Sequence, residues 1–263
     1  MGGGSGKRDD AGRLQHGGQW HHAQDWPLPG SHREQWYLQA DMGLRPQAAA
    51  AAAHILQSDP HHPVPTIGGS ITSGLPIFAG GAFDQREAPG FFGSASNNLP
   101  LSARADVLAF QSEPLPEDLC VAGDVRVRLW IDSDAPDTDF TAKLVDVYPP
   151  NEDYPQGYAM NITDGIIRCR YRNSWTQPEL LQPGEVVEVV IEPFATCNLF
   201  KKGHRLRLDI AGSNFPHFDC NPNSGEAEGE ARGKRTATSR VHVGGIHASV
   251  LELEVLPAAA LKG

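Results

Sequence analysis

The chain has 263 residues, which is enough for one large β domain or two small domains. Its formal net charge of -10 disfavours binding to nucleic acid, because phosphate backbones attract basic proteins. No apolar run reaches the roughly 18–20 residues that cross a bilayer, and the first residues, MGGGSGKRDDAG, lack the apolar core of a secretory signal. We therefore expect a cytoplasmic protein that binds neither nucleic acid nor membrane.

Residues 1–20 are glycine-rich and polar, and this composition predicts a flexible N-terminal segment. Residues 21–104 then comprise an entry strand around Trp36–Leu38, a low-complexity insert of six alanines (48–53) and long linking loops. The alanines could form one or two helical turns, although flanking prolines limit any helix. A loop as long as residues 61–98 is usually functional or wrapped over a neighbouring element.

Residues 105–263 show the two-residue hydrophobic period of strands that have one polar face. In RLRLDI (205–210) we expect the leucines and the isoleucine to face inward, and the arginines and the aspartate to face solvent. LELEV (251–255) repeats this pattern with its glutamates outside. Further strands are expected over residues 105–112, 125–132, 140–148, 162–171, 186–194 and 236–243.

One-sided strands are typical of antiparallel sheets, because parallel sheets are covered on both faces. Eight or more such strands without helical crossovers predict an all-β fold, and we expect a jelly-roll β-sandwich of the galactose-binding-like kind. The 28 glycines and 21 prolines would supply its many turns. The sandwich should span about residues 26–257, with its core over 105–263.

The sequence contains no G-x-S-x-G motif, the turn on which α/β-type hydrolases carry their nucleophile. Ser5, Ser70 and Ser213 each follow a glycine, but none of them has both of the glycines that the motif requires. No alternation of strands with helices is present to build such a turn. We therefore predict no catalytic residue in this chain.

Neither the histidines nor the acidic residues form a recognised metal-binding pattern. The stretch DSDAPDTDF (132–140) offers four aspartates as calcium ligands, but its spacing departs from that of an EF-hand loop. We favour a tight turn in which aspartate side chains accept backbone hydrogen bonds. Clustered histidines in the N-terminal part are interpreted as solvated loop residues: His16, His21, His22, His54, His61 and His62. No metal or cofactor is predicted.

The four cysteines, Cys120, Cys169, Cys197 and Cys220, include no CxxC pair. Two disulfides are compatible with the number alone. A reducing compartment, which suits four scattered thiols, predicts free and mostly buried cysteines.

The segment SNFPHFDCNPN (213–223) is rich in asparagine and aromatic residues and follows the RLRLDI strand. It either lines a binding site, as loops on rigid scaffolds often do, or forms a corner held by Asn and Asp side chains. The sequence favours neither interpretation.

Several motifs occur in an order that resembles the C-terminal domain of the X-Pro dipeptidyl-peptidase and cocaine-esterase family (the CocE/NonD hydrolases). DWPLPG, WYLQADMGL, PVPTIGG and AFDQRE are similar to the family's entry into that domain and its linking loops. DSDAPDTDF with TAKLVDV, then NITDGIIRCRYR, ELLQPGEVVEV and SNFPHFDCNPNSG, are similar to its sandwich. The resemblance extends from about residue 20 to about residue 256.

The resemblance implies an α/β-hydrolase domain, a helical cap and a C-terminal jelly roll, with acyl transfer by a Ser-His-Asp triad. In the family, all three catalytic residues lie upstream of the matching segment, so none is carried over to this chain. The jelly roll buttresses the hydrolase domain, and its leading loops help to close the active-site pocket. The matching loop makes Gly68, Gly69, Ser70 and Ile71 the expected rim of the substrate pocket. Alternatively, the double glycine only permits a tight bend.

The leading hypothesis is the C-terminal domain of a hydrolase acting on esters or X-Pro peptide bonds, inactive alone because the α/β-hydrolase domain is absent. The chain would then come from a truncated reading frame, or be a subunit that completes a separately encoded hydrolase. The alternative is a free-standing jelly roll that binds a carbohydrate or another ligand. Each is compatible with a homo-oligomer.

Overall fold

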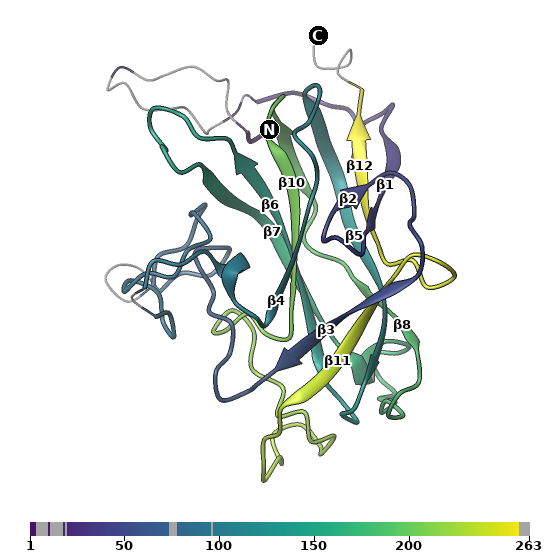
Figure 1. Ribbon diagram of the computed structural model, residues 1–263. Helices are drawn as coiled ribbons and strands as arrows, with labels where there is room; N and C mark the ends of the chain where they lie inside the picture. Colours follow the sequence, from purple (N-terminus) through teal and green to yellow (C-terminus); the bar gives the residue numbers. More distant parts are fainter. Residues whose placement is uncertain (4–9, 11–17, 19, 74–77, 96, 258–263) are drawn as a thin grey trace.

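A computed structural model of the chain describes residues 1–3, 10, 18, 20–73, 78–95 and 97–257. Within these residues the chain forms two antiparallel β-sheets, and its only helical elements are the 3-10 turns η1 (Leu101–Ala103) and η2 (Cys169–Tyr171). The two sheets pack face to face as a sandwich (Figure 1). The all-β prediction is confirmed, whereas the jelly-roll connectivity stays a prediction.

The larger sheet contains eight strands and the smaller sheet four. The larger consists of β1 (His32–Leu38), β2 (Leu44–Arg45), β3 (Ala52–Ser58), β5 (Leu119–Ser133), β8 (Val187–Ile191), β9 (Thr196–Phe200), β11 (Ala237–Val243) and β12 (Val250–Leu256). The smaller consists of β4 (Val107–Gln111), β10 (Arg205–Ala211), β6 (Asp139–Tyr148) and β7 (Tyr158–Arg168), in the spatial order β4-β10-β6-β7.

The 15-residue strand β5 is the central strand of the larger sheet and pairs with four others. It pairs with β12 and then β11 along one edge, and with β9 and then β8 along the other. β1 and β2 extend the sheet beyond β12, and β3 extends it beyond β11. The alternation of valine, leucine and isoleucine in VRVRLWID produces this element, because a period of two directs every second side chain to the same face.

The main core lies between the two sheets and is built from the inward side chains of both. Leu129 and Ile131 of β5 meet Phe140 and Leu144 of β6 and Leu208 of β10 in one buried cluster. Each of these side chains is at most 1% exposed. Burial of one such side chain contributes roughly 1.5–3 kcal/mol, so the interface between the sheets is the main source of stability.

The poly-alanine insert is not helical. Ala52 and Ala53 begin β3 and pair with Val243 and His242 of β11. Alanine's helix propensity is a weak preference that tertiary pairing overrides, so the sequence-based expectation of a helical turn was wrong here.

The expectation that β10 has a solvent-exposed face was also wrong. Arg207 and Asp209 point away from the core as predicted, yet they are only 5% and 6% exposed. They form a two-point ion pair, with Nε to Oδ1 at 2.8 Å and Nη2 to Oδ2 at 2.9 Å. They are covered because residues 59–73, 78–95 and 97–106, here named the loop layer, fold over this face of the smaller sheet (Figure 1).

Most of residues 1–20, predicted to be flexible, lie outside the described residues. At the start of the chain, the Gly2 N–H donates to the Cys197 carbonyl at 2.7 Å, beside β9. No described helix has the length and apolar character to span a membrane.

Candidate functional site

The loop layer is fixed to the sandwich by backbone hydrogen bonds. The N–H of Thr66 donates to the carbonyl of Phe215 at 2.7 Å, and the N–H of Gln85 donates to that of Ala159 at 2.9 Å. A second apolar cluster lies beneath the layer and contains Val64, Ile67, Leu101, Val107 and Ala211. The long loop predicted from the sequence is therefore wrapped over a neighbouring sheet, and its backbone is held in place.

The predicted rim residues lie at a tight turn in the loop layer. Gly68 and Gly69 have φ angles of 68° and 89°, a region that side-chain-bearing residues rarely adopt. Gly69 and Gly81 exchange two backbone hydrogen bonds of 2.8 Å. A Cβ atom on Gly68 would lie 2.4 Å from the carbonyl oxygen of Gly81. The double glycine thus permits a bend that other residues would not form.

A hollow of about 390 Å³ opens beside this turn. The turn forms one wall, residues 161–164 of β7 form another, and the segment after β8 forms a third. Its lining residues are Gly69, Ser70, Gly81, Ala82, Asn161, Ile162, Thr163, Asp164, Phe194 and Ala195. Of the four predicted rim residues, Gly69 and Ser70 line this hollow, whereas the buried Gly68 and half-buried Ile71 lie behind it.

At the hollow, a serine, a histidine and an aspartate from three segments lie in contact. The hydroxyl Oγ of Ser70 is 3.2 Å from Nε2 of His217. On the other side of the ring, Nδ1 of His217 is 3.2 Å from Oδ1 of Asp164. This second contact is electrostatic, since Nδ1 is buried and has no hydrogen-bond partner of good geometry among the described residues. The sequence alone predicts no role for His217 or Asp164.

Each member of this group is held by its own surroundings. The imidazole of His217 stacks on Phe218 with ring centres 4.1 Å apart, and its backbone N–H donates to Oγ1 of Thr66 at 3.2 Å. Oδ2 of Asp164 accepts a hydrogen bond of 3.1 Å from Nδ2 of Asn214. Burial raises the pKa of Asp164, but the contact with His217 and the charge of Lys143 outweigh it, so the net pKa lies below its usual value.

Lys143 is a buried cation near the site. Its Nζ donates to Oε1 of Gln85 at 2.8 Å, and its residue is 7% exposed. Burial lowers the pKa of Lys143, while the charges of Asp164 and Asp209 oppose that shift. A small cavity of about 20 Å³ lies against this lysine and is also lined by Asp164 and Asn214.

The segment 213–223 forms the corner held by asparagine side chains, which is one of the two interpretations that the sequence left open. Asn221 and Asn223 are buried, and Nδ2 of Asn223 donates to the carbonyls of Ser58 and Arg235 at 3.1 and 2.9 Å. These bonds make the segment a structured corner. The same corner also carries His217 to the hollow.

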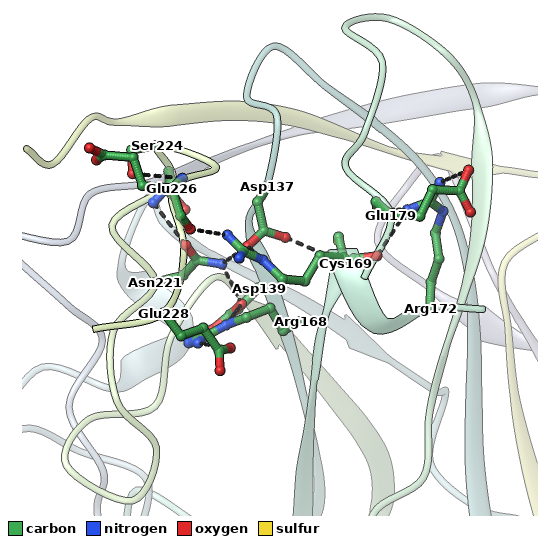
Figure 2. A network of polar contacts seen from close by, with 12 residues as sticks. Asp137, Asp139, Arg168, Cys169, Arg172, Glu179, Asn221, Ser224, Glu226 and Glu228 are labelled. Carbon is green, nitrogen blue, oxygen red and sulfur yellow. Dashed lines mark hydrogen bonds and ion pairs between the residues drawn. The ribbon is translucent and has the colours of Figure 1, made fainter. Parts of the chain in front are cut away.

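Two carboxylates of the acidic stretch 132–140, those of Asp137 and Asp139, are bound by arginine and asparagine side chains (Figure 2). Oδ2 of Asp137 accepts 2.8 Å hydrogen bonds from Nε of Arg170 and from Nδ2 of Asn221. The carboxylate of Asp139 accepts hydrogen bonds from Nε and Nη2 of Arg168 at 2.9 and 3.0 Å. Both aspartates are at most 1% exposed, so these cations replace the solvent that the carboxylates lose.

The other two aspartates of the stretch also contact protein groups. Asp132 contacts Nε of Arg240 at 2.9 Å and Nε2 of His242 at 2.6 Å. Oδ1 of Asp134 accepts the backbone N–H of Thr238 at 2.9 Å. All four carboxylates thus have partners within the protein: Asp134 and Asp137 lie in the turn, and Asp132 and Asp139 lie in the strands on either side of it. In the described part of the chain, no group of three or more His, Cys, Asp or Glu is arranged to hold a metal ion.

The four cysteines are free. Cys120 and Cys169 are buried, and Cys197 and Cys220 are half-buried. Burial raises the pKa of Cys120 to about 11, so this thiol is a poor nucleophile at neutral pH.

Comparison with known proteins places these features in a family. Residues 7–252 match the family described as the X-Pro dipeptidyl-peptidase C-terminal non-catalytic domain. The chain belongs to this family. It is the C-terminal non-catalytic domain of a CocE/NonD-type hydrolase, as the resemblance of its motifs implied.

Individual relatives agree with this assignment. The cocaine esterase of Rhodococcus sp. is 34% identical over 250 residues, which cover 90% of this chain and 40% of the esterase. A solved aminopeptidase from a marine sediment archaeon, Thaumarchaeota archaeon, has a TM-score of 0.73 at 27% identity, covering 95% of this chain and 40% of the aminopeptidase. A solved α-amino acid ester hydrolase has a TM-score of 0.66 at 25% identity, covering 93% of this chain and 39% of the hydrolase. The chain thus spans about two fifths of the length of these relatives.

Proposed function

We propose that this chain is the buttress of an α/β-hydrolase domain, and that the assembled enzyme cleaves ester or X-Pro peptide bonds through a catalytic serine of that domain. The observation that carries the proposal is how much of each protein the match to the cocaine esterase covers. The chain matches the cocaine esterase over 90% of its own length but over only 40% of the esterase. The remainder of the esterase is where the resemblance puts the catalytic triad. The partner domain either precedes this sequence in one polypeptide or is a separate subunit, in a cytoplasmic enzyme.

We assign the partner-facing surface to the loop layer and the adjacent hollow. Phe92 and Leu99 in the loop layer are 62% and 52% exposed, and Phe194 at the hollow is 69% exposed. Exposed large apolar side chains rimmed by polar residues are typical of surfaces that pack against another domain. The hydrolase domain is the proposed occupant, because the resemblance puts it in the part of the relatives that the match does not cover. Gly69 and Ser70 would then lie at the edge of its pocket, as the resemblance implied.

A carbohydrate-binding role is not favoured. The exposed tryptophan and phenylalanine side chains are spread over four separate segments of the described chain: Trp20 and Trp26 in the first, then Phe92, Trp175 and Phe194. A sugar-binding face usually offers aromatic rings on one surface, where they stack on the sugar.

A chimera tests the proposal. The C-terminal two fifths of the Rhodococcus cocaine esterase would be replaced by this chain, and ester hydrolysis measured beside that of the isolated chain. We expect turnover from the chimera and none above background from the isolated chain. In the chimera, Phe92→Asp should lower activity and assembly. Ile246→Asp is the matched control, because Ile246 is 89% exposed and lies outside the loop layer. Equal effects of the two substitutions would refute the assigned surface.

A further inference from the structure

We propose that Ser70, His217 and Asp164 form a covalent acceptor site, in which His217 activates the Ser70 hydroxyl toward small activated acyl esters and organophosphonates. Serine is unreactive as a free side chain and becomes a nucleophile when a neighbouring base removes its proton. The three side chains have the order and spacing that this activation needs.

The contacts set a chemical role for each nitrogen of the imidazole. Nε2 lies 3.2 Å from Oγ of Ser70, and Nδ1 lies 3.2 Å from a carboxylate oxygen of Asp164. A carboxylate beside Nδ1 stabilises the tautomer that carries its proton there. Nε2 is then unprotonated and accepts the hydroxyl proton of Ser70. Asp164 acts through His217 as a positioning residue.

The site is preorganised because its members come from fixed parts of the fold. Asp164 belongs to β7 and is bound by Asn214. The ring of His217 stacks on Phe218, and its backbone N–H donates to the Thr66 hydroxyl. Ser70 follows the glycine turn that Gly81 holds with two backbone hydrogen bonds. Such fixed geometry reduces the entropy lost when a reactant reaches the serine.

The hollow determines which reagents fit. Ser70 is exposed at its edge, so a reagent can approach Oγ from solvent. Ile162, Phe194 and Ala195 supply apolar surface in a space of about 390 Å³. This volume lies at the small end of ligand sites, so a short apolar acyl or alkyl phosphonyl group is the class we assign.

With a fluorophosphonate, the covalent step transfers a phosphonyl group to the serine. Oγ of Ser70 attacks phosphorus, the Oγ–P bond forms and the P–F bond breaks, so fluoride leaves with the bonding electron pair. The hydroxyl proton passes to Nε2 of His217 and then to water. An activated acyl ester reacts in the same way, with an alkoxide or phenolate as leaving group. Acceptance of one group requires no turnover, so this site stands independently of the proposed function.

The experiment uses the full 263-residue chain and a biotinylated fluorophosphonate, with initial labelling rates and peptide mapping by mass spectrometry. In the wild type we expect one equivalent of label, attached to Ser70. In the Ser70→Ala variant we expect no label at residue 70. Ser73→Ala is the matched control, because Ser73 is another exposed serine in the same loop, and it should label at the wild-type rate. His217→Gln should slow labelling by about 100-fold or more, the usual range for general-base assistance.

Two further readouts separate chemical from structural roles. Added imidazole should restore labelling of His217→Ala, because it replaces the base in the space left by the ring. Asp164→Asn should shift the pH of half-maximal labelling downward, because a negative charge that stabilises the protonated imidazole is removed while Lys143 remains nearby. Circular dichroism would establish that each variant is folded.

Label on a residue other than Ser70 would overturn the proposal, as would equal labelling rates for wild type and a folded His217→Gln. Failure of imidazole to restore labelling would also contradict it. Steady-state ester turnover that persists in Ser70→Ala would instead refute the proposed function and leave this site unaffected.

Discussion

Lys143 in β6 donates a 2.8 Å hydrogen bond from Nζ to Oε1 of Gln85, and this bond joins the smaller sheet to the loop layer. Both residues are buried, at 7% and 0% exposure. A buried ammonium group needs acceptors to offset its lost hydration. The placement of the whole loop layer is therefore coupled to a charge inside the sheet.

Substitution of Gln85 by leucine should destabilise the protein by about 2–3 kcal/mol, because the buried Lys143 ammonium loses its acceptor. Gln57→Leu is the control, since Gln57 is exposed on β3 and its loss should change stability by less than about 0.5 kcal/mol. Urea denaturation of both variants measures the difference. Equal stabilities would show that the Lys143–Gln85 bond does not contribute to the fold.

The charge of Asp164 should make stability depend on pH in the acid range. Its pKa is lowered in the folded protein, so the ionised form is the one that the fold stabilises. This contribution is present above the unfolded value near 3.8 and is lost as the pH falls through the folded value. Asp164→Asn should therefore be less stable than wild type at pH 6, and the difference should shrink below pH 4. Urea denaturation of both proteins across this pH range measures the difference in their free energies of unfolding. A difference that does not change with pH would contradict a lowered pKa of Asp164 in the folded protein.

Asp137→Asn should destabilise the protein by about 3–5 kcal/mol, because it leaves the buried guanidinium of Arg170 without its carboxylate. Asp134→Asn, in the same stretch but half exposed, should cost less than about 1 kcal/mol. Thermal unfolding measures both. Added calcium should leave the melting temperature of the wild type unchanged, and a rise with calcium would restore the metal interpretation of this stretch.

Gly68→Ala should disturb the turn that carries Ser70, because its φ is 68° and an added Cβ would meet the Gly81 carbonyl. Strain of this kind costs about 1–3 kcal/mol. Hydrogen exchange at the Gly69 and Gly81 amides should accelerate in the variant. Gly90→Ala is the control, since Gly90 is exposed and its added Cβ would meet no atom within 4 Å. Protection that is equal in both variants would count against a strained turn.

Much of the sandwich could be predicted from local pattern, and its less regular parts could not. Alternating apolar residues in VRVRLWID and RLRLDI reveal strands, because side chains alternate between faces. The same pattern does not indicate whether the face that points away from the core is exposed to solvent or covered by another segment. Arg207 and Asp209 look like solvent-facing residues in sequence, and only the fold brings the loop layer over them. β9 was missed, because TCNLF is short and mixes polar and apolar residues.

The group formed by Ser70, His217 and Asp164 could not be predicted from local sequence pattern. Ser70 was expected at a pocket rim only because its loop resembles a loop of the family, and the double glycine alone indicated no more than a tight bend. Ser70 and His217 are 147 residues apart, and no local signal links them. His217 belongs to a corner whose composition suited either a structural or a binding role. Only long-range packing of that corner against the loop layer and β7 brings the serine, histidine and aspartate together.

The most direct test of the central claim, that this chain is a non-catalytic domain, is steady-state hydrolysis by the purified chain alone. Activated esters and X-Pro amides would be assayed with wild type and Ser70→Ala, the latter to remove any contribution from Ser70. We predict no turnover above background from either protein, and at most one equivalent of leaving group released by the wild type. Sustained turnover by both proteins, abolished by a serine-directed phosphonate, would contradict the claim.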